Sequence, residues 1–217
     1  GDMKGGIACF MSALSRIDLD SLNYSIGFII TADEEGPSKD GTVKVVEELL
    51  HRNEKIDYCL IGEPSTLETV GDNIRIGRRG SINIELEVLG KQGHAAYPAR
   101  VDNPIHKVVP FLDKLLKEVW DEGNEHFPPT SLQLTNITAG VGAHNVTPNN
   151  LYLKFNLRFS TQISGEAIQE KVENFLKSEG IKHKVSFDIN AEPFYSEPKL
   201  FTDVVCQSIE DVQGFKT

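Results

Sequence analysis

The chain has few of the residues that mark several classes of protein. Only three of its 217 residues are cysteine, and Cys9, Cys59 and Cys206 lie far apart in the sequence. This spacing, in apolar segments, argues against a disulfide framework or a zinc knuckle and predicts reduced core thiols in a cytoplasmic protein. No apolar run approaches the roughly 18 residues of a membrane-spanning helix. Internal repeats and low-complexity segments are also absent.

Basic residues are scarce as well. The chain has 22 Lys and Arg residues against 32 Asp and Glu residues, which gives a formal net charge of -10. Nucleic acids bind basic surfaces, so we do not expect a nucleic acid as the partner. The length allows one large domain or two small ones, and the hydrophobic content of 39% is ordinary for a globular protein.

The first third of the chain has the pattern of an α/β layer. Apolar runs at 25–32 and 57–61 predict buried strands of a parallel sheet. Helical patterns at 6–17 and 42–50 precede them. The order helix–strand–helix–strand therefore predicts a parallel sheet covered by helices.

The middle of the chain has a different period. Apolar and polar residues alternate in four segments, which is typical of half-buried strands, and two helical patterns lie among them. The order βαββαβ predicts a ferredoxin-like domain inserted into the α/β layer. We expect the domains 1–77, 78–190 and 191–217. The predicted inserted elements are strands 81–89, 130–138, 151–160 and 184–189, and helices 103–120 and 164–178.

The two helices of the inserted segment carry start signals. Asn103 is a candidate cap with Pro104 at the first helical position, and Ser164 begins a capping-box pattern that lacks its Glu or Gln. Pro110 lies inside the first of these helices and predicts a kink there.

Carboxylates follow the apolar runs of the α/β layer. Glu34 and Glu35 follow the first run, Glu63 follows the second, and Asp2 precedes the first helix. Acidic residues at the ends of parallel strands lie where open α/β sheets bind ligands. Adjacent carboxylates repel each other unless a cation or a proton compensates, so this edge is a candidate site for a hard or borderline cation. A solvated acidic turn is the alternative.

Several short motifs carry a resemblance to a known family. The sequences GDMKG at 1–5, TADEEG at 31–36 and GEPS at 62–65 resemble the co-catalytic zinc motifs of the M20 metallopeptidase and amidohydrolase family. In the inserted segment, further runs resemble one branch of that family, the succinyl-diaminopimelate desuccinylases. These runs are GRRGS at 77–81, GKQGHAAYP at 90–98, DNPIH at 102–106, FPPTS at 127–131 and FNLRFS at 155–160.

The resemblance implies roles for individual residues. Asp2 would bridge two zinc ions, or cobalt in their place, with Glu63 on the first ion and Glu35 on the second. Glu34 would be the general base, and His94 would enter the partner subunit's active site and steady the oxyanion. Residues near the substrate carboxylates would be Arg78, Ser81, Tyr97, Asn145 and Arg158.

The resemblance also implies an activity and a partner. We expect zinc-dependent hydrolysis of N-succinyl-L,L-2,6-diaminopimelate to succinate and L,L-diaminopimelate, by a homodimer joined through the inserted domain. The two zinc-ligand histidines of the family would lie before Asp2 and after Thr217, so we expect an incomplete, inactive chain. The alternatives are another M20 amidohydrolase, such as acetylornithine deacetylase or an aminoacylase, and a noncatalytic dimerisation module.

The remaining histidines carry no motif. We expect His51, His106, His126 and His183 to be surface residues, since each lies among polar neighbours or at an element edge. His144 precedes Asn145 in a predicted loop, and a surface position is again favoured over an approach to the substrate.

Overall fold

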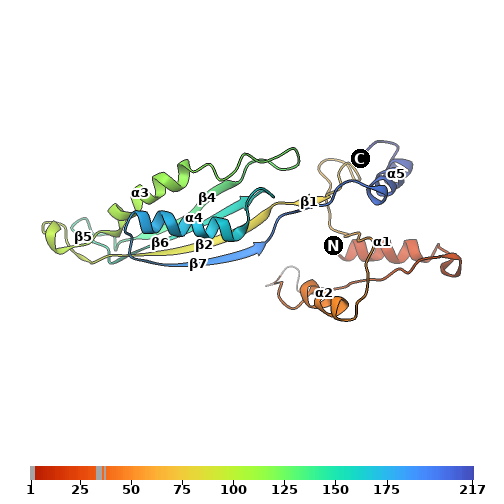
Figure 1. The fold of residues 1–217 in the computed structure, drawn as a ribbon, viewed down its shortest axis with the longest axis horizontal. Coiled ribbons are helices and arrows are strands. Elements are labelled where there is room, and N and C mark those ends of the chain that lie inside the picture. Colours follow the sequence, from red (N-terminus) through yellow and green to blue (C-terminus); the bar gives the residue numbers. More distant parts are fainter. Residues whose placement is uncertain (1–2, 33–35, 37) are drawn as a thin grey trace. The chain divides into compact units, whose positions relative to one another are not determined.

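The computed structural model describes residues 3–32, 36 and 38–217 of the chain (Figure 1). These residues form two compact units. The sheet unit is Arg75–Pro198, and the helical unit combines residues from Gly1–Ile74 with Lys199–Thr217. The sequence predicts domain boundaries after residues 77 and 190, and the two compact units divide after residues 74 and 198.

The sheet unit has the predicted order βαββαβ. Its four main strands form one antiparallel sheet in the order β4-β6-β2-β7, so β4 and β7 are the edges. The ferredoxin-like prediction is therefore confirmed in its strands, its helices and their sequence. The elements are β2 (Gly80–Leu89), α3 (Pro104–Lys117), β4 (Ser131–Ala139), β6 (Asn150–Phe159), α4 (Gly165–Ser178) and β7 (His183–Ala191).

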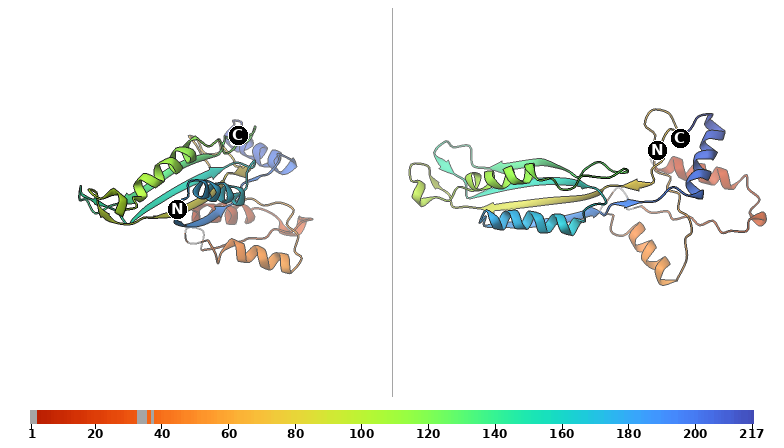
Figure 2. Two further views of the ribbon diagram at one scale, coloured as in Figure 1. Left: turned by 60° about the vertical axis from the view of Figure 1, so that its left-hand side comes forward. Right: turned by 45° about the horizontal axis from the view of Figure 1, so that its top comes forward.

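Alternation along the strands decides which face of the sheet is buried. The apolar side chains of β2 and β6 point to one face, and α3 and α4 cover that face (Figure 2). The opposite face carries polar side chains and is left open. Fully buried large side chains of this core are Phe111, Phe155, Phe159, Ile82, Ile84, Leu86, Leu115, Leu151, Leu153, Leu157, Ile168 and Leu176.

The predicted caps begin both helices of the sheet unit. The Asn103 side chain accepts a hydrogen bond from the Ile105 amide at 3.0 Å, and the Ser164 hydroxyl accepts one from the Ala167 amide at 3.2 Å. Helix α3 contains Pro110 but ends at Lys117, three residues before the predicted end. The chain then turns extended, and the indole of Trp120 is buried in the core at 7% exposure.

Two short ribbons lie at the ends of the long strands. At one end β1 (Gly77–Arg78) pairs with β8 (Phe194–Tyr195). The other ribbon pairs β3 (Gly93–His94) with β5 (Val146–Thr147), and the 3₁₀ helix η2 (Pro98–Arg100) follows β3. Neither ribbon has an alternating pattern long enough to be predicted from the sequence.

The helical unit contains the predicted helices without the predicted sheet. Helix α1 spans Lys4–Leu14 and α2 spans Thr42–His51, while η1 (Leu19–Ser21) and α5 (Leu200–Gln213) complete the unit. The predicted strands at 25–32 and 57–61 are wrong. Both segments are irregular and neither forms a ladder, and Ile30 and Ile61 are 66% and 68% exposed. The prediction of core thiols is wrong for Cys9 and Cys59, which are exposed because the described residues form no sheet to cover them.

The cause of this error is the absence of pairing partners among the described residues. An apolar run becomes a buried strand only when a neighbouring strand accepts its backbone hydrogen bonds and helices cover its faces. In the described part of the helical unit no segment supplies such a ladder. The parallel α/β layer is therefore not formed by these residues.

Candidate functional site

The predicted metal ligands and general base lie mostly outside the described residues. Asp2, Glu34 and Glu35 all fall in this class. Glu63 is described and is exposed in an irregular segment of the helical unit. That segment packs on the first turns of α1, since a Cβ placed on Gly6 would lie 2.9 Å from the Gly62 carbonyl oxygen. Any larger side chain at residue 6 would push the Glu63 segment away from α1.

A complete metal centre is not built by the described residues. Across 3–32, 36 and 38–217, no three His, Cys, Asp or Glu side chains gather closely enough to hold a metal ion. A zinc centre usually takes four ligands, three of them from the protein in a catalytic site. Glu63 alone therefore does not meet the requirement for zinc, and further protein ligands would be needed to complete a centre around it.

His94 lies on the β3–β5 ribbon in a defined orientation. Its Nδ1 atom accepts a hydrogen bond from the Ala96 amide at 3.1 Å, and its carbonyl accepts one from the Tyr97 amide at 2.9 Å. Because Nδ1 is an acceptor, the neutral ring carries its proton on Nε2. The exposed His94 side chain therefore presents an N–H donor, which is the group that a developing oxyanion needs.

Tyr97 and Asn145 lie beside His94. The rings of His94 and Tyr97 are 5.7 Å apart between centroids, and the Ala95 amide donates to the Asn145 carbonyl at 2.9 Å. The Arg100 guanidinium lies 5.4 Å from the centre of the Tyr97 ring, which is 57% exposed. Three of the predicted site residues thus gather at one end of the sheet unit, and we call them the His94 group.

The other predicted substrate residues gather at the β1–β8 end of the sheet unit. Ser81 on β2 is the register partner of Arg158 on β6, so both side chains lie on the open face of the sheet. Arg78 lies on β1, opposite Phe194. Ser81 is buried, while the side chains of Arg78 and Arg158 are exposed. We call these three residues the Arg158 group.

The two groups are too far apart to bind one small molecule together. Strand β2 separates them, and the extended chain from Ser81 to Leu89 alone spans roughly 27 Å. In Figure 1 the β1 and β5 labels mark the two ends of the sheet unit. A small substrate held by the Arg158 group of one chain can contact a His94 group only if a second chain supplies it.

A hollow of about 520 Å³ lies beside the His94 group. His106 and His144 both line it, together with Ala95 and the ion pair in which Lys107 contacts Asp102 at 2.5 Å. Both histidines are exposed, as the sequence predicts, but their meeting is not predicted. The ribbon joins segments about 50 residues apart, and no local pattern signals that pairing.

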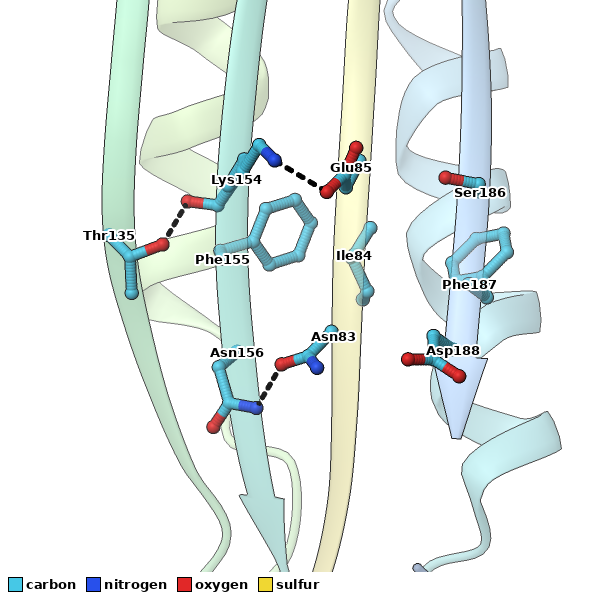
Figure 3. A pocket seen from close by; sticks show the side chains of 10 residues that line it. All are labelled: Asn83, Ile84, Glu85, Thr135, Lys154, Phe155, Asn156, Ser186, Phe187 and Asp188. Carbon is cyan, nitrogen blue, oxygen red and sulfur yellow. Dashed lines mark hydrogen bonds and ion pairs between the residues drawn. The ribbon is translucent and has the colours of Figure 1, made fainter. Parts of the chain in front are cut away.

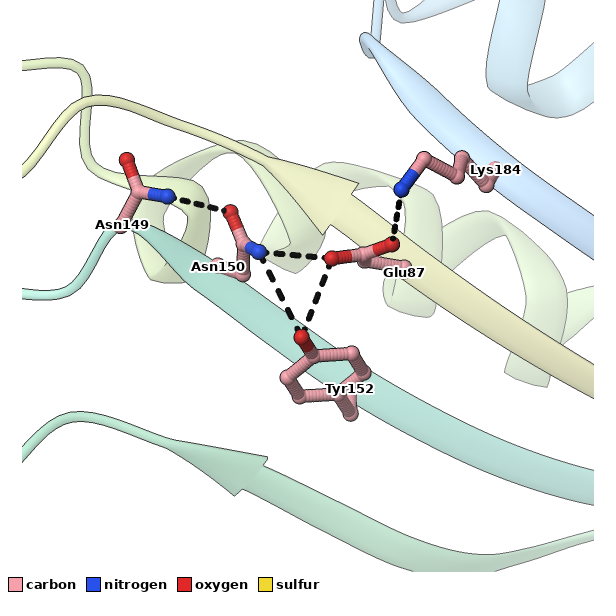
Figure 4. Close-up of polar contacts among 5 residues, drawn as sticks. All are labelled: Glu87, Asn149, Asn150, Tyr152 and Lys184. Carbon is pink, nitrogen blue, oxygen red and sulfur yellow. Dashed lines mark hydrogen bonds and ion pairs between the residues drawn. The ribbon is translucent and has the colours of Figure 1, made fainter.

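A second cluster on the open face is centred on Glu87 (Figure 4). Its carboxylate accepts hydrogen bonds from Lys184 Nζ at 2.9 Å, from Tyr152 Oη at 3.0 Å and from Asn150 Nδ2 at 2.6 Å. The Lys184 hydrogen bond is the main reason that the pKa of Glu87 lies below 4.5, and burial opposes it. The same contact raises the pKa of Lys184.

Comparison with known proteins identifies the family. A family model described as the peptidase dimerisation domain of M20 proteins matches residues 76–184, which is half of the chain and nearly all of the sheet unit. The chain belongs to the M20 family. The predicted fold class, a partial M20 hydrolase with an inserted dimerisation domain, is therefore confirmed at the level of the family, although the described residues do not form its parallel sheet.

Relatives of this M20 chain carry a common name. It is 47% identical over its whole length to succinyl-diaminopimelate desuccinylase of Hahella chejuensis. It is 45% identical, over 98% of its length, to the succinyl-diaminopimelate desuccinylase of Alkalilimnicola ehrlichii. The chain spans 57% of the length of each of these curated relatives.

Two solved structures share the fold at low identity. An M20 family metallo-carboxypeptidase from Sulfolobus solfataricus aligns with 80% of this chain and 59% of its own, with a TM-score of 0.67 and 14% identity. Human carnosine dipeptidase 1 aligns with 84% of this chain and 51% of its own, with a TM-score of 0.58 and 16% identity. At these identities the likeness shows the fold alone.

Proposed function

We propose that this chain is part of a zinc-dependent desuccinylase that hydrolyses N-succinyl-L,L-2,6-diaminopimelate to succinate and L,L-diaminopimelate. The observation that carries the proposal is the 47% identity across the whole chain to a relative of that name. The six residues of the His94 and Arg158 groups all lie in the sheet unit, and this supports the proposal further. Lysine and diaminopimelate synthesis in the cytoplasm is the setting that this activity implies.

The Arg158 group would hold the substrate carboxylates. Guanidinium groups pair with carboxylates through two parallel hydrogen bonds, which fixes the orientation of the substrate as well as its position. Arg78 and Arg158 are exposed and able to do this, and the Ser81 hydroxyl lies on the strand opposite Arg158. Such a site rejects substrates that lack a terminal carboxylate.

The His94 group would act on the reacting amide of a neighbouring subunit. Nε2–H of His94 donates to the oxygen on which negative charge develops as the amide carbon becomes tetrahedral. Tyr97 packs near the ring, and the Asn145 backbone holds the ribbon. Asn145 and Tyr97 would add polar contacts to the substrate.

The metal and the base would come from the helical unit. Asp2, Glu35 and Glu63 would be carboxylate ligands, with the remaining ligands supplied by residues beyond those described. Zinc, when bound, polarises a carbonyl and lowers the pKa of water. Glu34 would accept the proton of the attacking water and pass it to the departing amine.

A homodimer through the sheet unit would bring the two groups together. Helix α3 carries exposed apolar side chains at i, i+4 and i+11, namely Ile105, Val109 and Leu116, and β4 is a free edge of the sheet. A helix face beside a strand edge is a surface that two copies can share through a twofold axis. An apolar patch of this kind usually marks an interface.

The test begins with the mass and zinc content of the natural full-length protein and of the 217-residue chain. We expect about two zinc ions per subunit in the full-length protein, as a co-catalytic centre requires, and succinate release from N-succinyl-diaminopimelate. The 217-residue chain should release none. A panel with N-acetylornithine and N-acetylated amino acids is the control. Hydrolysis of those substrates without hydrolysis of the succinyl compound would overturn the proposal.

A further inference from the structure

A row of hydrogen-bonded side chains crosses the open face of the sheet. Asn156 Nδ2 donates to Asn83 Oδ1 at 2.8 Å (Figure 3), and Asn83 Nδ2 donates to Asn190 Oδ1 at 2.7 Å. Asn190 Nδ2 then donates to Asp188 Oδ2 at 2.9 Å. These four residues, which we call the amide relay, link β6, β2 and β7. Asn156, Asn83 and Asp188 also line a hollow of about 260 Å³.

The carboxylate at one end fixes the direction of the whole relay. An ionised carboxylate only accepts hydrogen bonds, so Asn190 must turn its NH₂ group toward Asp188. The oxygen of Asn190 then faces Asn83, whose NH₂ group turns toward it. By the same step Asn83 presents its oxygen to Asn156. Asn156 therefore turns its NH₂ group toward the acceptors on β2.

The relay ends at Ser81. One proton of Asn156 Nδ2 goes to Asn83, and the other is shared between the Ile82 carbonyl oxygen at 3.1 Å and Ser81 Oγ at 3.3 Å. Ser81 is only 5% exposed, so water does not freely reorient its hydroxyl. Because Oγ accepts from Asn156, the Ser81 proton has to go to another acceptor. Within the part of the chain that the structure describes, no side chain or carbonyl accepts it.

We propose that the amide relay is a positioning device that holds Ser81 as a hydrogen-bond donor toward a substrate carboxylate. This inference rests on the proposed function, which puts Ser81 near such a carboxylate. Arg158, opposite Ser81, also has only donors. Two donors side by side match a ligand oxygen that only accepts, so the relay selects a carboxylate over an amide NH₂ or an amine.

Reversing the relay is the sharpest test. Asn156→Asp replaces a donor by an isosteric acceptor, so the Ser81 proton turns toward residue 156 and away from the ligand. Asn83 and Asn190 must then flip, and the oxygen of Asn190 meets the Asp188 carboxylate. Adding Asp188→Asn supplies an NH₂ group at that end and satisfies the reversed relay. The double variant therefore restores the hydrogen bonds among residues 156, 83, 190 and 188, but not the one to the Ile82 carbonyl, while Ser81 stays turned away.

The measurements use the zinc-loaded full-length protein. Succinate affinity is measured by calorimetry, KM with N-succinyl-diaminopimelate, and stability by urea unfolding. We expect Asn156→Asp to weaken succinate binding and raise KM about tenfold, the effect of losing one hydrogen bond to a charged group, and to lower the urea midpoint. The double variant should regain part of the midpoint, since residue 156 still gives no proton to the Ile82 carbonyl, and should keep the tenfold loss of affinity. If the double variant regained the succinate affinity as well as stability, the relay would have a purely structural role and the proposal would be overturned.

Gln133→Glu is the matched control for charge. Gln133 on β4 is the register partner of Asn156, on the side away from Asn83, and it is exposed. It adds the same negative charge beside Asn156 but leaves Asn156 as a donor to Asn83 and Ser81, so affinity should fall less than about threefold. If Gln133→Glu lost as much succinate affinity as Asn156→Asp, the cause would be charge repulsion and not the direction of the hydrogen bonds, and the proposal would be overturned. Unchanged succinate affinity in Ser81→Ala would also overturn the relay's role, whereas an unmutated protein without desuccinylase activity would overturn the proposed function.

Discussion

Glu87 links three strands through a single carboxylate. It lies on β2, and its partners are Lys184 on β7 and both Tyr152 and Asn150 on β6. Its side chain is only 17% exposed, so water competes weakly for these hydrogen bonds. Glu87 lies two residues before the end of β2, after which the chain continues into the β3–β5 ribbon that carries His94.

Glu87→Gln should reduce the acid sensitivity of the sheet unit. The folded pKa of Glu87 is depressed, so its stabilising effect is full above the unfolded value of about 4.5 and is lost as the pH falls through the lower folded value. The variant should be less stable at neutral pH and should lose less further stability between pH 5 and the acid limit. Urea midpoints measured across that range check this.

Lys184→Met provides the second arm of a double-mutant cycle. The pKa of Lys184 is raised by the same contact, so its contribution is full below 10.5 and is lost as the pH rises through the folded value. Each single variant should flatten the acid slope, Lys184→Met less because Tyr152 and Asn150 still contact Glu87, and the double variant should flatten it no further than Glu87→Gln. Additive slopes would mean that the two residues do not act through their mutual contact.

At the scale of elements, the cap of α4 is a defined contribution to stability. The Ser164 hydroxyl accepts from the Ala167 amide, one of the four amides that the first turn leaves without a helical partner. Ser164→Ala should lower the free energy of unfolding by about 1 kcal/mol, and Ser164→Asp by only a few tenths. Trp120 is the only tryptophan and is buried in the sheet-unit core, so its fluorescence reports this unfolding. Equal losses in the two variants would contradict a capping role.

The elements that the sequence predicts correctly carry their own partners. In β2, the alternation that buries Ile82 and Ile84 and exposes Asn83 identifies both the strand and its core face, and β6 and β7 pair with it within the same chain. The runs at 25–32 and 57–61 are just as apolar, but a strand also needs a ladder. Apolar content indicates that a segment seeks burial and does not show which segment will pair with it.

The candidate site divides in the same way. Arg158 and Ser81 are found from motifs on long strands, and their meeting follows once the register of β2 and β6 is known. The neighbours of His94 depend on the ribbon between β3 and β5, whose two residues per strand give no periodic signal. The amide relay is also beyond sequence reasoning, because it joins Asn156, Asn83 and Asn190 across three strands.

For the whole molecule, the length of β2 is the decisive dimension. It holds the Arg158 group and the His94 group at opposite ends of the sheet unit, so one chain cannot apply both to one small substrate. The proposed twofold dimer would solve this, since each chain would then lend its His94 group to the other and each dimer would have two composite sites. The composite site makes a quantitative prediction about mixtures of variants.

Co-expression of His94→Ala and Arg158→Ala full-length subunits should restore activity that each variant lacks alone. Half of the dimers formed from equal amounts are mixed, and in each of these one of the two sites has neither substitution. The mixture should therefore have about a quarter of the unmutated specific activity, measured as succinate release per subunit. If each site were built within one chain, every site would contain a substitution and the mixture would stay inactive.

The reciprocal mixture is the control. Unmutated subunits are co-expressed with subunits that carry both His94→Ala and Arg158→Ala. With composite sites, every mixed dimer has one defect in each site, so only the unmutated dimers work and about a quarter of the activity remains. With sites built within single chains, the unmutated subunit works in any dimer and about half remains. With shared sites, both mixtures thus keep about a quarter of the unmutated activity. With separate sites, the first mixture keeps none and the second keeps about half.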